Sequence, residues 1–173
     1  MKVPARAAAV AAGLALLAAC SPSEEGPATL AKGVYHAMEF GEQAALGPVD
    51  AADGQEAVVF TVAEPVRISA PCRYGDASLR VRVTIKTGTD PLYVNQLEGL
   101  FGDFPGDNVA IESDSGIVST ADINTTCGSN VLGVVFDTNE SYTLDLDLDA
   151  LSDSGTLILT SPRVPDSGWT WEL

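Results

Sequence analysis

Two segments of this chain alternate strictly between apolar and polar residues, and this pattern restricts the fold more than any other feature. Residues 79–86 read Leu-Arg-Val-Arg-Val-Thr-Ile-Lys, and residues 143–149 read Thr-Leu-Asp-Leu-Asp-Leu-Asp. Because successive side chains of a strand point to opposite faces, each segment is expected to form a strand with one buried and one solvated face.

Weaker patterns predict more strands, and no 12-residue helical pattern accompanies them. Pro65 is expected to kink or divide one of these strands, since proline cannot donate to a ladder. Turn signals separate the strands, including three Asp-Ser-Gly triplets that begin at Asp114, Asp153 and Asp166. Many short strands with alternating faces predict an all-β sandwich. The further strands are expected at residues 39–46, 57–69, 92–101, 109–113, 131–137, 157–160 and 169–173.

The first 20 residues predict export and lipidation. Lys2 and Arg6 precede an apolar run over residues 7–19, which is too short to span a membrane and fits a secretory signal. Leu-Ala-Ala directly before Cys20 resembles the bacterial lipobox, in which the cysteine thiol receives a diacylglycerol. Residues 1–19 are therefore expected to be cleaved, and acyl chains on Cys20 to anchor the protein at the extracytoplasmic face of the cell membrane. The alternative is an ordinary secretory signal followed by an unmodified cysteine.

The mature chain is expected to comprise a tether and one domain. Residues 20–37 open with serine, proline, glutamate and glycine and show no apolar periodicity, which is typical of a flexible tether. Residues 38–173 are long enough for one domain with a substantial core. Removing Lys2 and Arg6 leaves seven basic residues against 24 acidic residues, a net charge near −17. Such a charge excludes nucleic acid as an expected partner.

Five of the seven mature basic residues lie within a short stretch of the chain, and two interpretations of them stay open. They could form a docking patch for an anionic envelope polymer. Alternatively, the two alternating strands pair with each other in one sheet of the sandwich, so that arginines face aspartates across the ladder; the sequence favours this pairing. The five basic residues are Arg67, Arg73, Arg80, Arg82 and Lys86, and the candidate interaction surface comprises Arg80, Arg82, Lys86, Asp145, Asp147 and Asp149.

The aspartates at 145, 147 and 149 superficially resemble a calcium loop. An EF-hand requires glycine at its sixth position and glutamate at its twelfth, where this chain has Ala150 and Thr156. The sequence therefore predicts a solvated strand face and no metal site, with loose divalent binding near Asp149 and Asp153 as the alternative.

Two cysteines remain in the mature domain, Cys72 and Cys127. In an exported protein such a pair is expected to form a disulfide, and the 54 residues between them exclude a redox Cys-x-x-Cys motif. Two free thiols are the alternative. Trp169 and Trp171 share one face of the last predicted strand and are expected in the core, although an exposed pair would form a binding platform.

Catalytic and cofactor signals are weak. His36 is the single histidine, so a serine triad or a histidine metal site has few candidate residues, and no cofactor is expected. A pair of carboxylates for glycoside hydrolysis stays open among the 24 acidic residues, but no feature selects two of them.

Several strand motifs resemble an immunoglobulin-like lipoprotein domain family of unknown function from high-GC Gram-positive bacteria, similar in fold to a secreted mycobacterial immunoprotective antigen. The resemblance covers residues 38–173 and implies an immunoglobulin-like sandwich without catalytic residues. One departure is the turn after the first alternating strand, which is Thr87-Gly88-Thr89-Asp90 where the family usually has asparagines. The motifs are Gly41-Glu42, Val59-Phe60-Thr61-Val62, residues 79–87, Ser141-Tyr142-Thr143-Leu144, residues 155–159 and Trp169-Thr170-Trp171.

Together these features predict a membrane-anchored extracytoplasmic lipoprotein that acts as a non-catalytic binding or accessory module at the bacterial cell envelope. Its expected partners are the membrane, through Cys20, and an envelope protein or polymer. The alternative function is an extracellular ligand or divalent-cation binding protein that uses the acidic loops, and an enzyme ranks third.

Overall fold

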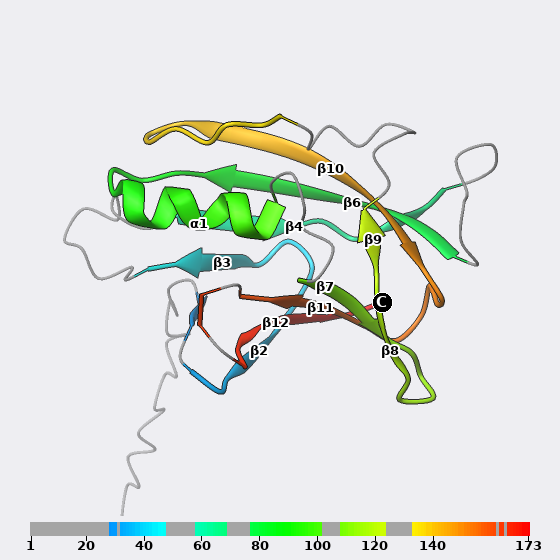
Figure 1. The fold of residues 1–173 in the computed structure, drawn as a ribbon. Helices are drawn as coiled ribbons and strands as arrows, with labels where there is room; N and C mark the ends of the chain where they lie inside the picture. Colours follow the sequence, from blue (N-terminus) through cyan, green and yellow to red (C-terminus); the bar gives the residue numbers. More distant parts are fainter. Residues whose placement is uncertain are drawn as a thin grey trace, which may run out of the picture.

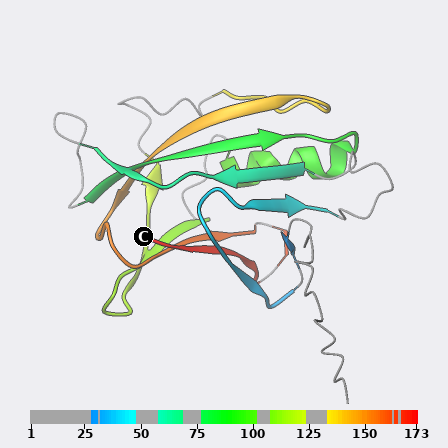
Figure 2. The same cartoon turned by 180° about the vertical axis from the view of Figure 1, so that it is seen from behind.

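Two sheets packed face to face form the body of the protein. The structure is a computed structural model that describes residues 28–30, 32–47, 58–68, 77–101, 108–123, 133–161, 163–164 and 166–173. The sheets form two layers, and the helix α1 (Pro91–Phe101) lies along one side of them (Figures 1 and 2). Sheet A has the order β1 (Ala28–Thr29), β3 (Gln43–Leu46), β4 (Val58–Val62), β6 (Ala77–Lys86), β10 (Ser141–Ala150) and β9 (Asp122–Ile123), and β5 (Val66–Arg67) also pairs with β6. Sheet B has the order β2 (Tyr35–Met38), β12 (Gly168–Glu172), β11 (Thr156–Thr160), β7 (Val109–Glu112) and β8 (Val118–Thr120).

The strand order is immunoglobulin-like. In that fold one sheet has the order A-B-E-D and the other contains C, F and G. Here β4, β6, β10 and β9 are neighbours in the positions of A, B, E and D, while β7, β11 and β12 take the positions of C, F and G. The expected all-β, immunoglobulin-like sandwich is confirmed. The helix α1 is an addition in the connection between the second and third strands of this scheme.

The two alternating segments form the longest strands, β6 and β10, as predicted. Their apolar side chains point into the sandwich, where Leu79, Val81, Leu144 and Leu148 are at most 3% exposed. Pro65 lies between β4 and β5, and both of these strands pair with β6. The expected division of that strand at the proline is also confirmed.

The strand expected over residues 92–101 is wrong, because this segment forms α1. The carboxylate of Asp90 accepts a hydrogen bond of 2.8 Å from the backbone N–H of Leu92 and so caps the helix. Pro91 occupies the first helical position, where its missing N–H costs nothing. The buried residues follow helical spacing and are Val94, Leu97, Leu100 and Phe101.

The strand expected over residues 131–137 is also wrong for residues 133–137, which form a loop. Phe136 is buried in this loop and packs edge-on against Tyr142, with ring centroids 5.0 Å apart. The backbone N–H of Asp137 donates to the Tyr142 hydroxyl at 2.6 Å. Aromatic packing thus explains the apolar character of this segment without a ladder.

The domain begins earlier than the predicted boundary at Met38. β1 pairs with β3 at Ala28–Thr29, and β2 pairs in parallel with β12 from Tyr35 to Met38. Residues 28–29 and 35–37, which were expected to be part of a tether, therefore belong to strands of the domain. His36 lies opposite Trp169 in sheet B. Both strands are too short to show periodicity in the sequence, and residues 20–27 lie outside the described ranges.

Three aromatic rings join the layers at the centre of the core. Phe60 of sheet A contacts Trp169 of sheet B edge-on, with centroids 4.9 Å apart, and Phe101 of α1 at 5.6 Å. Trp169 and Trp171 are at most 1% exposed, which confirms the core role predicted for them.

Candidate functional site

The charged sides of β6 and β10 lie next to each other on the outer face of sheet A. The strands are antiparallel neighbours, and their register places Arg80 opposite Asp147 and Arg82 opposite Asp145. The predicted pairing of these two strands is therefore confirmed. It places both arginines within reach of a carboxylate on the same face.

Arg80 and Asp147 form a two-pronged ion pair. The Nε and Nη2 atoms of Arg80 donate to the two carboxylate oxygens of Asp147 at 2.7 and 2.8 Å. The Asp147 side chain is only 3% exposed, whereas that of Arg80 is 34% exposed. The hydrogen bond to Asp147 raises the pKa of Arg80 above its ordinary value. Removing one partner of a buried ion pair leaves a charge without compensation, so Arg80 serves the fold.

Arg82 and Asp145 form a similar but more exposed pair. The Nε and Nη2 atoms of Arg82 donate to Asp145 at 2.8 and 3.1 Å, with the side chains 59% and 21% exposed. The hydrogen bond from Arg82 holds the pKa of the Asp145 carboxyl below its ordinary value. The same bond raises the pKa of Arg82. Because solvent screens this pair, its contribution to stability is small.

The other two members of the predicted surface do not pair with each other. Lys86 lies opposite Ser141, at the far end of the ladder from Asp149. Asp149 lies opposite Ser78 and accepts a 2.8 Å hydrogen bond from the Ser78 hydroxyl. Lys86 shares the outer face of sheet A, as expected, but the prediction that it lies beside an aspartate is wrong. Register depends on the whole connection between the two strands, which includes a helix that the sequence pattern did not show.

The predicted basic cluster is largely neutralised. Besides Arg80 and Arg82, Arg67 contacts Asp153 at 3.0 Å. Arg73 lies outside the described ranges. Within the part of the cluster that the structure describes, each arginine therefore faces an acid, and Lys86 is the cation without an ion pair. This arrangement weakens the docking interpretation for an anionic polymer.

The cysteines that carry the sequence predictions lie outside the described ranges. These are Cys20, expected to be lipidated, and Cys72 and Cys127, expected to form a disulfide. Among the residues that are described, no three His, Cys, Asp or Glu side chains gather closely enough to hold a metal ion. The described helix is also not long and apolar enough to cross a membrane.

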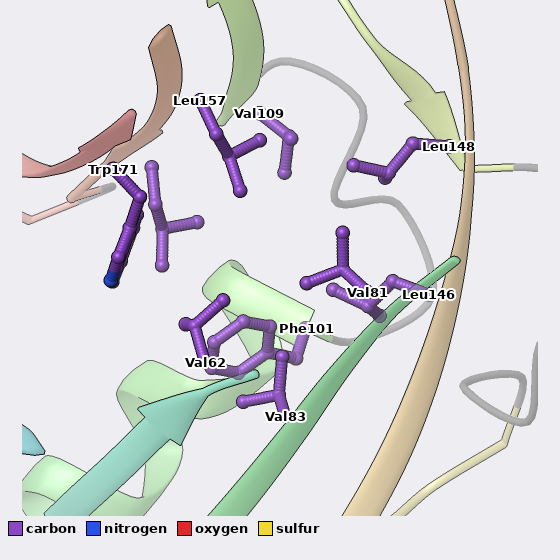
Figure 3. Close-up of a pocket in the computed structure, with 10 residues that line it drawn as sticks. Val62, Val81, Val83, Phe101, Val109, Leu146, Leu148, Leu157 and Trp171 are labelled. Atoms are coloured by element: carbon purple, nitrogen blue, oxygen red, sulfur yellow. The ribbon is translucent and has the colours of Figure 1, made fainter. Parts of the chain in front are cut away.

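A small cavity of about 20 Å³ lies between the sheets, lined only by apolar side chains from both sheets and α1 (Figure 3). This volume is about that of one water, but a water needs two or more polar partners to be held in place. The cavity is a packing defect of the core and too small to be a ligand site. Its lining includes Val62, Val81, Leu157, Trp171 and Phe101.

Three polar atoms are buried without a hydrogen-bond partner in the described part of the chain. They are the indole nitrogens of Trp169 and Trp171 and Nε2 of His36. An unpaired buried donor costs about 1 to 3 kcal/mol, which the large apolar rings offset by burial. These side chains are packing residues.

The outer face of sheet B has a different chemistry from that of sheet A. Three rows of outward side chains cross its strands, and none of the described elements covers them (Figure 1). We call this surface the B face. Its central row is Ala37, Thr170, Ile158, Ala110 and Thr120, its upper row is Glu172, Thr156, Glu112 and Val118, and its lower row is Tyr35, Gly168 and Thr160.

The central and lower rows of the B face contain no charged residue. In the lower row the Tyr35 hydroxyl reaches the Thr160 hydroxyl at 3.4 Å across Gly168. Tyr35 is 44% exposed. This surface was not predicted from the sequence, because its central and lower rows hold no charged or catalytic side chain. The signal was the alternation of Thr156, Ile158 and Thr160 with buried leucines, which predicts an uncharged outer face.

Fold and surface together define a small immunoglobulin-like sandwich with one charged sheet face and one whose central and lower rows lack charge. No family model matches the chain, and no curated protein matches it. Among solved structures, it is similar to the 1.5 Å crystal structure of MPT63, a secreted protein from Mycobacterium tuberculosis. The two chains are 14% identical, the match covers 82% of this chain and 100% of that chain, and the TM-score is 0.48. The resemblance to a lipoprotein domain family stays a prediction.

Proposed function

We propose that this protein is a lipid-anchored, extracytoplasmic lipoprotein that acts as a non-catalytic binding or accessory module at the bacterial cell envelope. The observation that carries the proposal is the N-terminal sequence: two basic residues, an apolar run over residues 7–19 and Leu-Ala-Ala before Cys20. Acyl chains on the Cys20 thiol hold the protein at the membrane, and stable anchoring requires at least two chains. The sandwich then presents its faces to envelope partners.

The test is Cys20→Ala in the full chain. We expect this variant to lose incorporation of labelled palmitate and to be released from the membrane fraction or retained as an uncleaved precursor. Ser21→Ala, the adjacent substitution, is the control and should behave as the wild type. If Cys20→Ala remains in the membrane fraction at the mature mass, the anchoring proposal is wrong.

The proposal includes a disulfide between Cys72 and Cys127, because exported proteins fold in an oxidising environment. We expect no titratable thiol in the purified, denatured mature protein before reduction and two after reduction. Two thiols before reduction would contradict the bridge.

The alternative function, binding of a divalent cation by acidic loops, gains little from the aspartate strand. Asp145 and Asp147 accept hydrogen bonds from arginines, and Asp149 accepts one from Ser78. A cation would have to displace these donors. Calorimetric titration with calcium separates the two functions: binding heat together with a rise in Tm would favour the cation binder.

A further inference from the structure

The B face is an open side of the sandwich whose centre lacks charge. Its central and lower rows consist of threonine, alanine, isoleucine, glycine and tyrosine. In a chain with 33 charged residues among 173, such a surface is unusual. Depletion of charge together with an exposed tyrosine is the composition that marks the centre of a protein interface.

Charge is confined to the two ends of the B face, and the ends differ in sign. The upper row carries Glu112 and Glu172, and Asp114 follows in the adjoining hairpin. Beyond the lower row lie Lys32, just before β2, and Arg163, just after β11. Asp166 also lies in the loop of Arg163. Among the described residues that flank β2, β11 and β12 at the lower end, two are cations and one is an acid, whereas the three charged residues of the upper end are all acids.

We propose that the B face binds a second copy of this chain, with the strands of the two copies antiparallel. A two-fold axis along the central row places each copy's acidic end over the basic end of the other. The uncharged row then packs against itself around Ile158, which lies on β11, the middle strand of the sheet. Such an interface is isologous, since both copies use the same surface.

The small area of the B face indicates a dimer of low affinity. Five strands about 4.8 Å apart and three to five residues long cover roughly 350 Å² per copy. A standard stable interface buries about 800 Å² per partner, so this dimer is weak and reversible. Two copies held in one membrane would be concentrated, which favours association, but the interface itself does not depend on the anchor.

Crosslinking through single cysteines tests the contact. Packed sheets lie about 10 Å apart, a gap that a short bis-maleimide spans. In the full chain, Ile158→Cys should yield a crosslinked species of twice the monomer mass. Thr84→Cys, on the exposed outer face of sheet A, is the matched control and should not. The wild-type chain, treated in the same way, serves as the control for crosslinking through the native cysteines.

The same chemistry tests the orientation. With antiparallel strands, residue 156 of one copy lies over residue 160 of the other. A mixture of Thr156→Cys and Thr160→Cys chains should therefore crosslink between the two variants, whereas each variant alone should crosslink weakly. Strong crosslinking of each variant alone would overturn the antiparallel arrangement.

Charge exchange tests the ends without disturbing the core. Glu172→Lys alone and Arg163→Glu alone should each weaken association about three- to tenfold. The double variant, which has the wild-type net charge, should restore it. Sedimentation of the full chain in detergent measures the dimer fraction. A double variant that associates even more weakly than either single variant would contradict the proposed pairing.

The outcome that overturns the dimer is specific. Ile158→Cys that reacts with a monofunctional maleimide but gives no species of twice the monomer mass would show that the B face does not meet a second copy. Crosslinks only to polypeptides of another mass would assign the face to a different partner. The proposed envelope function could survive either result, and the dimer could survive loss of the anchor.

Discussion

The side chain of Asp147 lies on the outer side of sheet A but is only 3% exposed, and it forms an ion pair with Arg80. The alternation in the sequence predicts an exposed side chain at this position, whereas the fold buries it. The guanidinium of Arg80 contacts both oxygens of this carboxylate. Removing either partner leaves a charge with no compensation.

Arg80→Ala should therefore lower the free energy of unfolding by about 2 to 4 kcal/mol, because it strands the buried Asp147 charge. Arg82→Ala is the matched control on the same strand and should lower the free energy of unfolding much less, since that pair is exposed. Chemical denaturation measures both variants. Equal effects would show that burial of Asp147 does not govern the pair.

Asp145 predicts a pH dependence with a definite sign. Arg82 lowers the pKa of Asp145 in the folded state, so the pair contributes stability that is present above the unfolded pKa of about 4. That contribution is lost as pH falls through the lower folded pKa. At pH 6 the free energy of unfolding of the wild type should exceed that of Asp145→Asn by less than about 1 kcal/mol. This difference should disappear towards pH 3. Denaturation across this pH range measures the gap, and one that widens on acidification would contradict the assignment.

Among the elements, α1 shows where sequence patterns give the wrong structure. The apolar residues within 92–101 are spaced in a way that fits a strand as well as a helix. The signals that distinguish the two are Asp90 and Pro91, which mark the start of a helix. The strands β6 and β10 could be predicted because their alternation extends over many residues. The strands β1, β2, β8 and β9 could not, because two to four residues show no period.

The sequence could also indicate that β6 and β10 pair, but not their register. Arg80 and Arg82 face aspartates, while Lys86 faces Ser141, and one shift of two residues would have changed every partner. The expected pairing of arginines with aspartates is therefore confirmed for Arg80 and Arg82, whereas Lys86 and Asp149 take other partners across the ladder. The B face required a three-dimensional arrangement, since its rows join strands that lie far apart in the sequence.

The N-cap of α1 can be tested directly. Asp90→Ala should lower the free energy of unfolding by about 0.5 to 2 kcal/mol, because it removes the acceptor of the Leu92 N–H. Asp90→Asn retains an acceptor and should cost much less, and Thr89→Ala, outside the cap, serves as a second control. Thermal unfolding followed by circular dichroism gives the ranking. An unchanged Tm in Asp90→Ala would exclude a capping role.

For the whole molecule, the contact of Phe60 with Trp169 and Phe101 couples the two sheets and the helix. A sandwich joined in this way is expected to unfold as a single unit. The two tryptophans report on sheet B, and far-ultraviolet circular dichroism reports on all strands.

Phe60→Ala should lower the free energy of unfolding by about 3 to 5 kcal/mol, because it leaves a cavity where the two sheets and α1 meet. Although Phe60 lies in sheet A, the midpoint of the tryptophan fluorescence transition should fall by the same amount as the midpoint of the circular dichroism transition. Val118→Ala, at an exposed edge of sheet B, should change neither by more than about 0.5 kcal/mol. Separate transitions for the two probes would show that the sheets unfold independently.

The position of β1 at Ala28–Thr29 gives the proposed anchor at Cys20 a geometric consequence. Seven residues, 21–27, separate Cys20 from β1, so even a fully extended link would reach about 25 to 30 Å. With the proposed acyl chains on Cys20, the sandwich would lie within a few nanometres of the bilayer. A ligand of such a domain would have to reach the membrane surface to bind it.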